Sequence, residues 1–246
     1  MPSLPRSHNI VGRWVPSAGA TGFRLVDRVR SNHGTLTNMD PASDWVASGG
    51  KGALDFDGSN DNVNCGTRVP RLGNGHTFAA WVFKRANGGM IAGMCDSIPF
   101  GGIEWADQGG NFAFAFFDGS IRGWFAGPAL PSNQWSFVCA AFSHTSQRLV
   151  VNTTAATTSA STSGIVYNND AWRIGVASTG NPFWSGQIDD VTLWDRFLTD
   201  AEINTVYRLG RGYGVFPEPD LDEGFAAAGF KAYWARRQSQ LIGGGV

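Results

Sequence analysis

HTFAAWVFK, residues 76–84, is the stretch that decides the fold class of this chain. Successive side chains of a β-strand point to opposite faces of a sheet, so Phe78 and Val82 share one face while Trp81 and Phe83 share the other. Both faces are apolar, and a strand of that kind belongs in the middle of a sheet that is covered on both sides. The stretch therefore predicts a core strand of a layered β-protein.

The same doubly apolar pattern recurs at residues 111–117 (NFAFAFF) and 134–142 (QWSFVCAAF). Glycine-containing connections at residues 87–89 (NGG), 108–110 (QGG) and 118–119 (DG) permit the positive φ angles that hairpin turns need. We therefore expect successive strands to be antiparallel neighbours. Strand and turn signals at such short intervals are typical of an all-β sandwich and not of alternating strands and helices.

Two segments depart from the strand pattern. Residues 199–209 (TDAEINTVYRL) predict a short helix packed beside the sandwich, because Thr199 is a suitable N-cap and Glu202 completes a capping box. Its apolar stripe consists of Ile203, Val206 and Tyr207. Residues 153–164 (TTAATTSASTSG) are small and polar, and we expect them to form an exposed loop.

The charge balance and the cysteines exclude several classes of protein. Nineteen basic and twenty acidic residues give a formal net charge of −1 without a basic stripe, so nucleic acid is not an expected partner. No apolar run approaches the roughly 18 residues of a membrane span, and the N-terminus does not resemble a signal peptide. We therefore expect no membrane partner and synthesis in the cytoplasm. Cys65, Cys95 and Cys139 match no metal-binding spacing, which favours reduced, buried thiols.

The composition divides the chain into three parts. Residues 1–9 form an N-terminal arm, residues 10–214 the sandwich domain, and residues 215–246 a Pro-rich acidic linker followed by a C-terminal tail. The tail carries aromatic and basic side chains that predict docking on a partner: Phe230, Tyr233, Trp234, Arg236 and Arg237. The alternative is that the tail folds back on its own sandwich.

Four ordered stretches resemble the laminin-G-like, or concanavalin-A-like, lectin/glucanase superfamily. They are residues 27–36 (DRVRSNHGTL), 52–63 (GALDFDGSNDNV), 77–82 (TFAAWV) and 186–203 (GQIDDVTLWDRFLTDAEI). The resemblance covers roughly residues 10–210 and implies a jelly roll of two antiparallel sheets. The last twenty residues also resemble C-terminal endings of bacteriophage virion proteins.

The resemblance raises the question of catalysis. Glucanases on this fold use a Glu-x-Asp-x-x-Glu strand, because carboxylates at i and i+2 share one face of the strand. Residues 55–60 end in an amide and belong to a turn motif, and in residues 104–107 (EWAD) the carboxylates are three apart and fall on opposite faces. Neither stretch supplies an acid/base pair, so we expect no enzymatic activity. An active glucanase is the alternative that such a pair would have favoured.

The remaining candidate sites are a metal site and a sugar platform. Relatives bind Ca²⁺ through carboxylates at the rim of the sandwich. The calcium candidates here are Asp57, Asp61, Asp189 and Asp190, and no other cofactor is expected. We expect these acids to be mainly structural: Asp57 holds a turn with Gly58, and the Asp189 and Asp190 pair lies at a strand start. The available sugar platforms are Trp105, Trp124, Trp172 and Trp184.

Two functions fit these observations. The first is a non-enzymatic phage virion structural protein, made in the host cytoplasm and carried on the virion as a capsid decoration or cement protein. Its partners would be the major capsid protein or other virion proteins, surface glycans, and further copies of itself in a trimer. The second is a lectin-like carbohydrate-binding adhesion module on a phage tail or fibre, or in a bacterium.

Overall fold

The computed structural model describes residues 9–69, 75–96, 101–118, 121–158, 165–167, 170–177 and 182–212. All of them fall within the unit Met1–Phe216. Residues 1–8 of the predicted arm, and the whole linker and tail from residue 215 onward, lie outside the described residues. No described helix is long and apolar enough to span a membrane.

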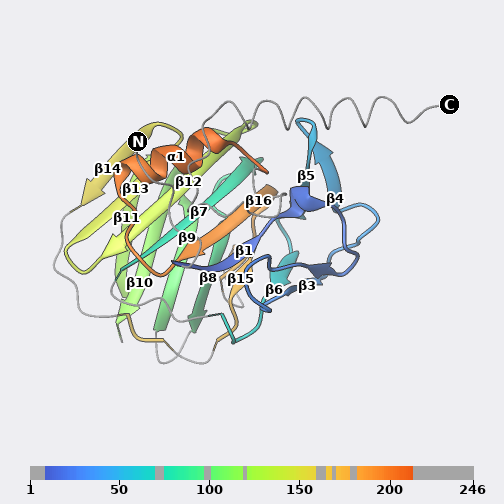
Figure 1. The fold of residues 1–246 in the computed structure, drawn as a ribbon, viewed down its shortest axis with the longest axis horizontal. Coiled ribbons are helices and arrows are strands. Elements are labelled where there is room, and N and C mark those ends of the chain that lie inside the picture. Colours follow the sequence, from blue (N-terminus) through green and yellow to red (C-terminus); the bar gives the residue numbers. More distant parts are fainter. Residues whose placement is uncertain are drawn as a thin grey trace, which may run out of the picture. The chain divides into compact units, whose positions relative to one another are not determined.

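The described strands form two antiparallel sheets packed face to face, which confirms the predicted sandwich (Figure 1). Sheet A has the order β14 (Thr154–Thr158), β13 (Ser146–Val151), β12 (Trp135–Ser143), β7 (Gly75–Lys84), β16 (Ser185–Trp194), β5 (Lys51–Asp57) and β4 (Trp45–Ser48), with β1 (Ile10–Trp14) also paired to β16. Sheet B has the order β11 (Ile121–Ala129), β10 (Asn111–Asp118), β9 (Gly101–Gln108), β8 (Met90–Asp96), β15 (Arg173–Ile174), β6 (Asn62–Asn64), β3 (Gly34–Thr37) and β2 (Arg24–Leu25). A 3-10 turn, η2 (Pro16–Ala18), and one helix, α1 (Asp200–Leu209), complete the described elements.

The core lies between the two sheets and is rich in aromatic rings. β7 lies in the interior of sheet A, between β12 and β16, as its doubly apolar pattern predicts. Its inner face carries Phe78, which stacks on Trp105 of β9 with ring centroids 4.4 Å apart. Its outer face carries the buried Ala79, which belongs to a second apolar cluster with Ile203 and Val206 of α1. The strand is therefore covered on both sides.

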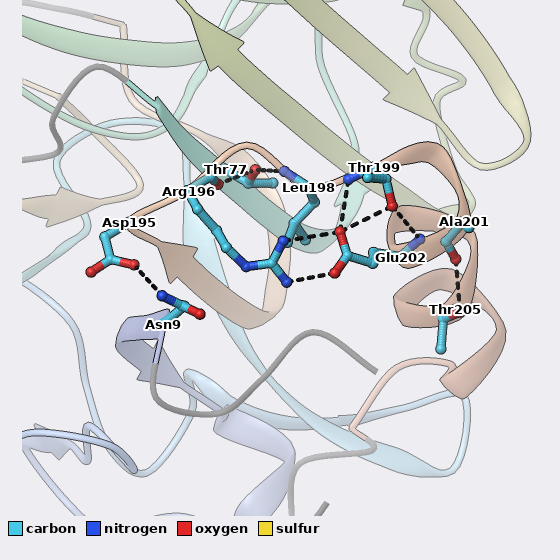
Figure 2. A network of polar contacts seen from close by, with 9 residues as sticks. All are labelled: Asn9, Thr77, Asp195, Arg196, Leu198, Thr199, Ala201, Glu202 and Thr205. Carbon is cyan, nitrogen blue, oxygen red and sulfur yellow. Dashed lines mark hydrogen bonds and ion pairs between the residues drawn. The ribbon is translucent and has the colours of Figure 1, made fainter. Parts of the chain in front are cut away.

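The helix begins as the sequence predicts. Thr199 is the N-cap and forms a complete capping box with Glu202, whose carboxylate accepts the backbone N–H of Thr199 at 2.8 Å. Figure 2 shows that the same carboxylate also accepts two hydrogen bonds from Arg196, at 3.0 and 2.6 Å. Hydrogen bonding to Arg196 lowers the pKa of Glu202 to about 2.

Thr77 ties this turn to the sheet. Its hydroxyl donates to the carbonyl of Arg196 at 2.9 Å and accepts the N–H of Leu198 at 3.0 Å, as Figure 2 shows. Leu198 is fully buried. The segment between β16 and α1 is therefore fixed to β7, which directs the helix onto the outer face of sheet A.

Two local predictions were wrong. Residues 154–158, expected in a loop, form the edge strand β14 in register with β13, from Val151 opposite Thr154 to Gln147 opposite Thr158. An exposed edge strand needs no apolar side chains, and threonine favours the extended backbone. Residues 159–164 lie outside the described residues. The NGG turn at 87–89 joins β7 of sheet A to β8 of sheet B and is no hairpin, whereas the QGG turn joins the paired strands β9 and β10.

The cysteine prediction is confirmed. Cys65, Cys95 and Cys139 are all buried, and Cys65 and Cys139 are free thiols. Burial raises the pKa of Cys65 and Cys139 well above the usual range of a thiol, so neither is poised to act as a nucleophile.

Candidate functional site

The outer face of sheet B carries one continuous row of side chains, one from each of its eight strands. From one edge to the other the row consists of Arg24, Thr35, Asn64, Arg173, Gly93, Glu104, Ala115 and Trp124. Each residue is directly opposite the next in the strand register. We call this set the sheet B row.

The row faces outward because its chain neighbours face the core. Leu36, Val63 and Ile174, which follow or precede row residues by one position, are buried in the cluster between the sheets. The same holds on the other half of the sheet for Trp105 and Phe114. Since side chains alternate along a strand, the row lies on the opposite face from this core.

Four residues at the β2 side of the row form a positively charged surface, which we call the cationic end: Arg24, Thr35, Asn64 and Arg173. Arg24 is exposed and Arg173 is half-buried. Arg173 Nη1 lies 3.4 Å from the carbonyl oxygens of Ala171 and Ala177. Within the described residues no acidic side chain pairs with either arginine.

Thr35 and Asn64 lie between the two arginines and add polar groups. Thr35 is exposed, and Asn64 is half-buried with its Oδ1 accepting the backbone N–H of Gly66 at 2.9 Å. This bond orients the Asn64 side chain and leaves its amide N–H group available as a donor. Four strands at about 4.8 Å spacing give the cationic end a length of about 14 Å.

The centre of the row is closed. Glu104 is 3% exposed and stands between the small residues Gly93 and Ala115. A Cβ at Gly93 would meet the Cβ of Ala177 at 2.8 Å, so this part of the chain lies directly over the row. Ala177 is itself fully buried. The two ends of the row are therefore the accessible parts.

The two acids of the 104–107 stretch lie on opposite faces of β9, as predicted. Glu104 is opposite Ala115 in the outward row, whereas Asp107 is opposite the core residue Phe112. Asp107 Oδ2 lies 3.4 Å from Lys84 Nζ in an ion pair between the sheets and accepts the N–H of Gly88 at 2.8 Å. A retaining glycosidase needs two carboxyl groups about 5 Å apart on one face, and this stretch does not supply them.

Three of the four predicted sugar platforms were wrong. Trp105, Trp172 and Trp184 are at most 1% exposed and belong to the core cluster. Trp105 and Trp172 contact each other edge to face, with centroids 5.3 Å apart. Trp124, at the far end of the sheet B row, is half-buried and keeps an exposed surface. Its role as a sugar platform stays a prediction.

The first pair of calcium candidates holds a turn, as predicted. Asp57 Oδ1 accepts the N–H groups of Ser59 at 2.7 Å and Asn60 at 3.3 Å, and Gly58 takes a φ of 83°. Although slight burial raises it, these backbone hydrogen bonds bring the pKa of Asp57 below its usual range. Asp61 accepts the N–H of Asp57 at 3.0 Å, and burial raises the pKa of Asp61.

The second pair lies in the middle of β16, not at a strand start, which corrects the sequence interpretation. The register of β16 against β7 shifts there, and Asp190 has a φ of 55°. Asp189 lies 3.5 Å from Arg211 Nη1 and accepts the N–H of Ser17 at 3.1 Å. Asp190 accepts the N–H of Gly212 at 2.5 Å. The bulge thus turns both carboxylates toward the chain that follows α1.

This environment raises the pKa of Asp189. Burial and the neighbouring Asp190 carboxylate bring it to about 7, against hydrogen bonding from Ser17 and the charge of Arg211. The four calcium candidates thus form two separate pairs with protein partners. Among the described residues no three His, Cys, Asp or Glu side chains gather into a metal-binding group.

Sequence reasoning missed the cationic end. Its residues belong to four strands between positions 24 and 173 and form no motif along the chain. The available signal was the flanking pattern, because a polar residue beside a core residue, as in Arg173 after Trp172, points away from the core.

Known proteins share this architecture. A family model described as the concanavalin A-like lectin/glucanases superfamily matches residues 57–204. Domain 4 of AbnA, an extracellular arabinanase of Geobacillus stearothermophilus solved in complex with arabinotriose, has a TM-score of 0.62 and 14% identity over 81% of this chain and 98% of that one.

Two larger proteins contain a similar part. The binding domain of Paraclostridial Mosquitocidal Protein 1 has a TM-score of 0.63 and 14% identity, covering 82% of this chain and 52% of that one. Trypanosoma rangeli sialidase has a TM-score of 0.62 and 14% identity, covering 87% of this chain and 34% of that one. No curated protein sequence matches. At these identities the likeness to solved structures shows the fold alone.

Proposed function

Because the chain belongs to the concanavalin A-like lectin/glucanase superfamily, we propose that it is a non-enzymatic carbohydrate-binding domain whose cationic end binds an acidic glycan. The observation that carries this proposal is the pair of arginines, Arg24 and Arg173, on one outward row without acidic partners in the described part of the chain.

The chemistry of the cationic end fits a carboxylated or sulfated sugar. A guanidinium group presents parallel N–H donors that match a carboxylate or sulfate in a bidentate geometry. Thr35 and Asn64 supply neutral groups for sugar hydroxyls between the two charges. A length of about 14 Å accommodates a short oligosaccharide, with its acidic groups directed to the arginines.

The fold similarity supports a sugar as the ligand class. Domain 4 of the Geobacillus stearothermophilus arabinanase corresponds to this chain over nearly its whole length, and its structure contains arabinotriose. Trp124 lies four strand spacings from Arg173, about 19 Å, so it would contact a different part of an extended ligand.

The absence of catalysis is part of the proposal. Glu104 is the one acidic member of the sheet B row, and the nearby Asp107 is directed into the core and neutralised by Lys84. Glycoside hydrolysis by two carboxyl groups therefore has no pair to work with on this row.

A second proposal concerns where the domain acts. We propose display on a phage particle as a decoration protein, which rests on the tail sequence alone, including Trp234 and Arg237. A chain that ends at residue 215 should fail to assemble on particles that lack the protein. Assembly equal to that of the full chain would contradict this placement without affecting the sugar-binding proposal.

A glycan array tests the carbohydrate proposal. The full chain should bind spots with uronic acid, sialic acid or sulfated sugars, and Arg24→Ala and Arg173→Met should lose most of that signal. Arg208→Ala is the matched control, because Arg208 is an exposed arginine of α1, which packs on sheet A. Equal loss in the control, or wild-type binding without preference for acidic sugars, would refute the assignment to the cationic end.

A further inference from the structure

The helix covers only part of the outer face of sheet A. Tyr207, in the last turn of α1, stacks on Trp81 with centroids 5.9 Å apart and contacts Phe137 at 5.7 Å. Trp81 and Phe137 are directly opposite in the register of β7 and β12. The helix ends two residues later, at Leu209, so it covers this sheet up to the Trp81 position.

The next outward position along the sheet forms a second row. From β12 to β5 it consists of Trp135, Phe83, Gln187 and Asp55. Each residue is directly opposite the next, and all four are half-buried, so each keeps an exposed surface. We call this set the sheet A row. Four strands at about 4.8 Å give it a length of about 14 Å.

Trp135 is held in a fixed position. The guanidinium carbon of Arg211 lies 4.0 Å from the centroid of its ring, and its indole N–H donates to Ser48 Oγ at 3.1 Å. Phe83 contacts it edge to face, at 6.0 Å between centroids. Arg211 is itself buried against Asp189, so the support beneath the indole is rigid. A ring that is ordered before binding loses little entropy when a ligand stacks on it.

The other end of the row is polar. Gln187 Nε2 lies 3.4 Å from Asp55 Oδ2, and Arg85 forms an ion pair with the same carboxyl group. Gln187 Oε1 is buried and has no hydrogen-bond partner within the described residues. A ligand hydroxyl can satisfy such an acceptor after a small rotation of the amide. Aromatic surface beside an amide, a carboxylate and a guanidinium is a combination that binds a ring bearing several hydroxyl groups.

The charges of the sheet A row cancel. Arg85 forms an ion pair with Asp55, and Arg211 is buried beside the carboxyl groups of Asp189 and Asp190. An acidic ligand would meet the Asp55 carboxylate here, in contrast to the cationic end of sheet B. We propose that the sheet A row is a second binding site, for a neutral oligosaccharide. This inference goes beyond the proposed function, because it places a different ligand on the opposite sheet and does not depend on the cationic end.

Two outward-facing rows on opposite sheets give the domain a way to connect two glycans. Packed sheets are about 10 Å apart, and the side chains of the two rows point in opposite directions. One short sugar chain cannot reach both rows. A surface that carries neutral and acidic glycans would therefore be bound at two points, which strengthens attachment by effective concentration.

The experiment is NMR of the full chain with ¹⁵N-labelled tryptophan. The probes are arabinotriose, xylohexaose and cellohexaose, and the Trp135 indole signal is assigned with Trp135→Phe. We expect saturable shifts of the Trp135 signal with at least one probe, unchanged in Arg173→Met. Gln187→Ala, which leaves the aromatic pair in place, should weaken this binding roughly threefold to tenfold, as expected for a neutral hydrogen bond.

The outcomes separate the two proposals. If the neutral probes move the Trp124 signal and leave Trp135 still, or move neither, the sheet A row is not a sugar site. If Gln187→Ala binds the neutral probe with the same affinity as the wild type, measured from the Trp135 shifts, the inference is also overturned. If the proposal for the cationic end is wrong, the wild type will not bind acidic glycans, while the Trp135 signal still shifts with a neutral probe. Unfolding curves of Gln187→Ala verify that its effect is not a loss of structure.

Discussion

Replacing Lys84 by Met should strongly destabilise the domain, because this side chain neutralises a carboxylate in the core. Lys84 and Asp107 are 2% and 0% exposed, and their charged atoms are 3.4 Å apart. Asp107 Oδ2 has one further partner, the N–H of Gly88, and Asp107 Oδ1 has none within the described residues. Without Lys84 the carboxylate would remain buried with a single hydrogen bond.

The size of the effect follows from this burial. Breaking a buried ion pair by removing one partner costs about 3–5 kcal/mol, because the remaining charge is neither solvated nor paired. For a domain of this length each kcal/mol lowers Tm by about 2–4 °C, so Lys84→Met should lower it by roughly 6–20 °C. Asp107→Asn should lose a similar amount, since it leaves the ammonium group of Lys84 without its partner.

A double-mutant cycle in urea at pH 7 measures this interaction. The cycle compares the single variants Lys84→Met and Asp107→Leu with the double variant that carries both changes. The double variant should recover most of the stability, because two apolar side chains of similar size can replace a buried pair. Acidic-glycan binding by the folded variants should match that of the wild type. A loss below about 1 kcal/mol in both single variants would refute the structural role of the pair.

Three further predictions concern stability and are checked by urea unfolding. The raised pKa of Asp189, about 7, means that the folded protein holds this proton more tightly than the unfolded chain does; this contribution is complete below the ordinary value near 3.8 and is lost as pH rises through 7. The stability difference between wild type and Asp189→Asn should therefore change between pH 5 and pH 8, and a constant difference would contradict it. Thr199→Ala should cost about 1 kcal/mol through loss of the N-cap, whereas Thr205→Ala on the same helix should cost clearly less. Trp105→Ala should cost about 3–5 kcal/mol by leaving a core cavity, and Trp124→Ala should cost less because its side chain is partly exposed; the reverse order would contradict the placement of these rings.

Local patterns in the sequence predicted those parts of the fold that depend on neighbouring residues. The alternation at residues 76–84 identified β7 as an interior strand, because a two-sided apolar pattern has no other place in a sandwich. The spacing of Thr199 and Glu202 predicted the helix start, because both partners of the capping box lie within one turn of the chain.

Features that depend on tertiary packing were not predictable in this way. Residues 154–158 form a strand because they pair with the edge of β13. Their polar composition goes with the exposure of this edge strand and does not indicate a loop. At the bulge, the Asp190 carboxylate accepts the backbone N–H of Gly212, a partner that follows α1 and is distant in the sequence. Composition alone could not separate the core residue Trp105 from the partly exposed Trp124. Trp105 is opposite Phe114 of β10, whereas Trp124 is opposite the next residue, Ala115, and so lies on the other face of the sheet.

The candidate sites depend on strand order, which is a property of the whole fold. Arg24 and Arg173 share one face because β2, β3, β6 and β15 are neighbours in sheet B although they are distant in sequence. Trp135 and Asp55 are brought into one row by β7 and β16 in the same way. Their side chains carry no common motif, so the register had to be known before the rows could be found.

Calorimetric titration of the cationic end tests the central claim most directly. The probes are trigalacturonic acid, sialyllactose and a sulfated chondroitin disaccharide, titrated at low and high salt into wild type, Arg173→Met and Arg208→Ala. At least one acidic probe should bind, more weakly at high salt, and Arg173→Met should lose about tenfold or more in affinity, as expected for charge-assisted hydrogen bonds. Arg208→Ala should bind as the wild type does. Absence of binding to all three probes, or equal affinities of Arg173→Met and Arg208→Ala, would contradict the account.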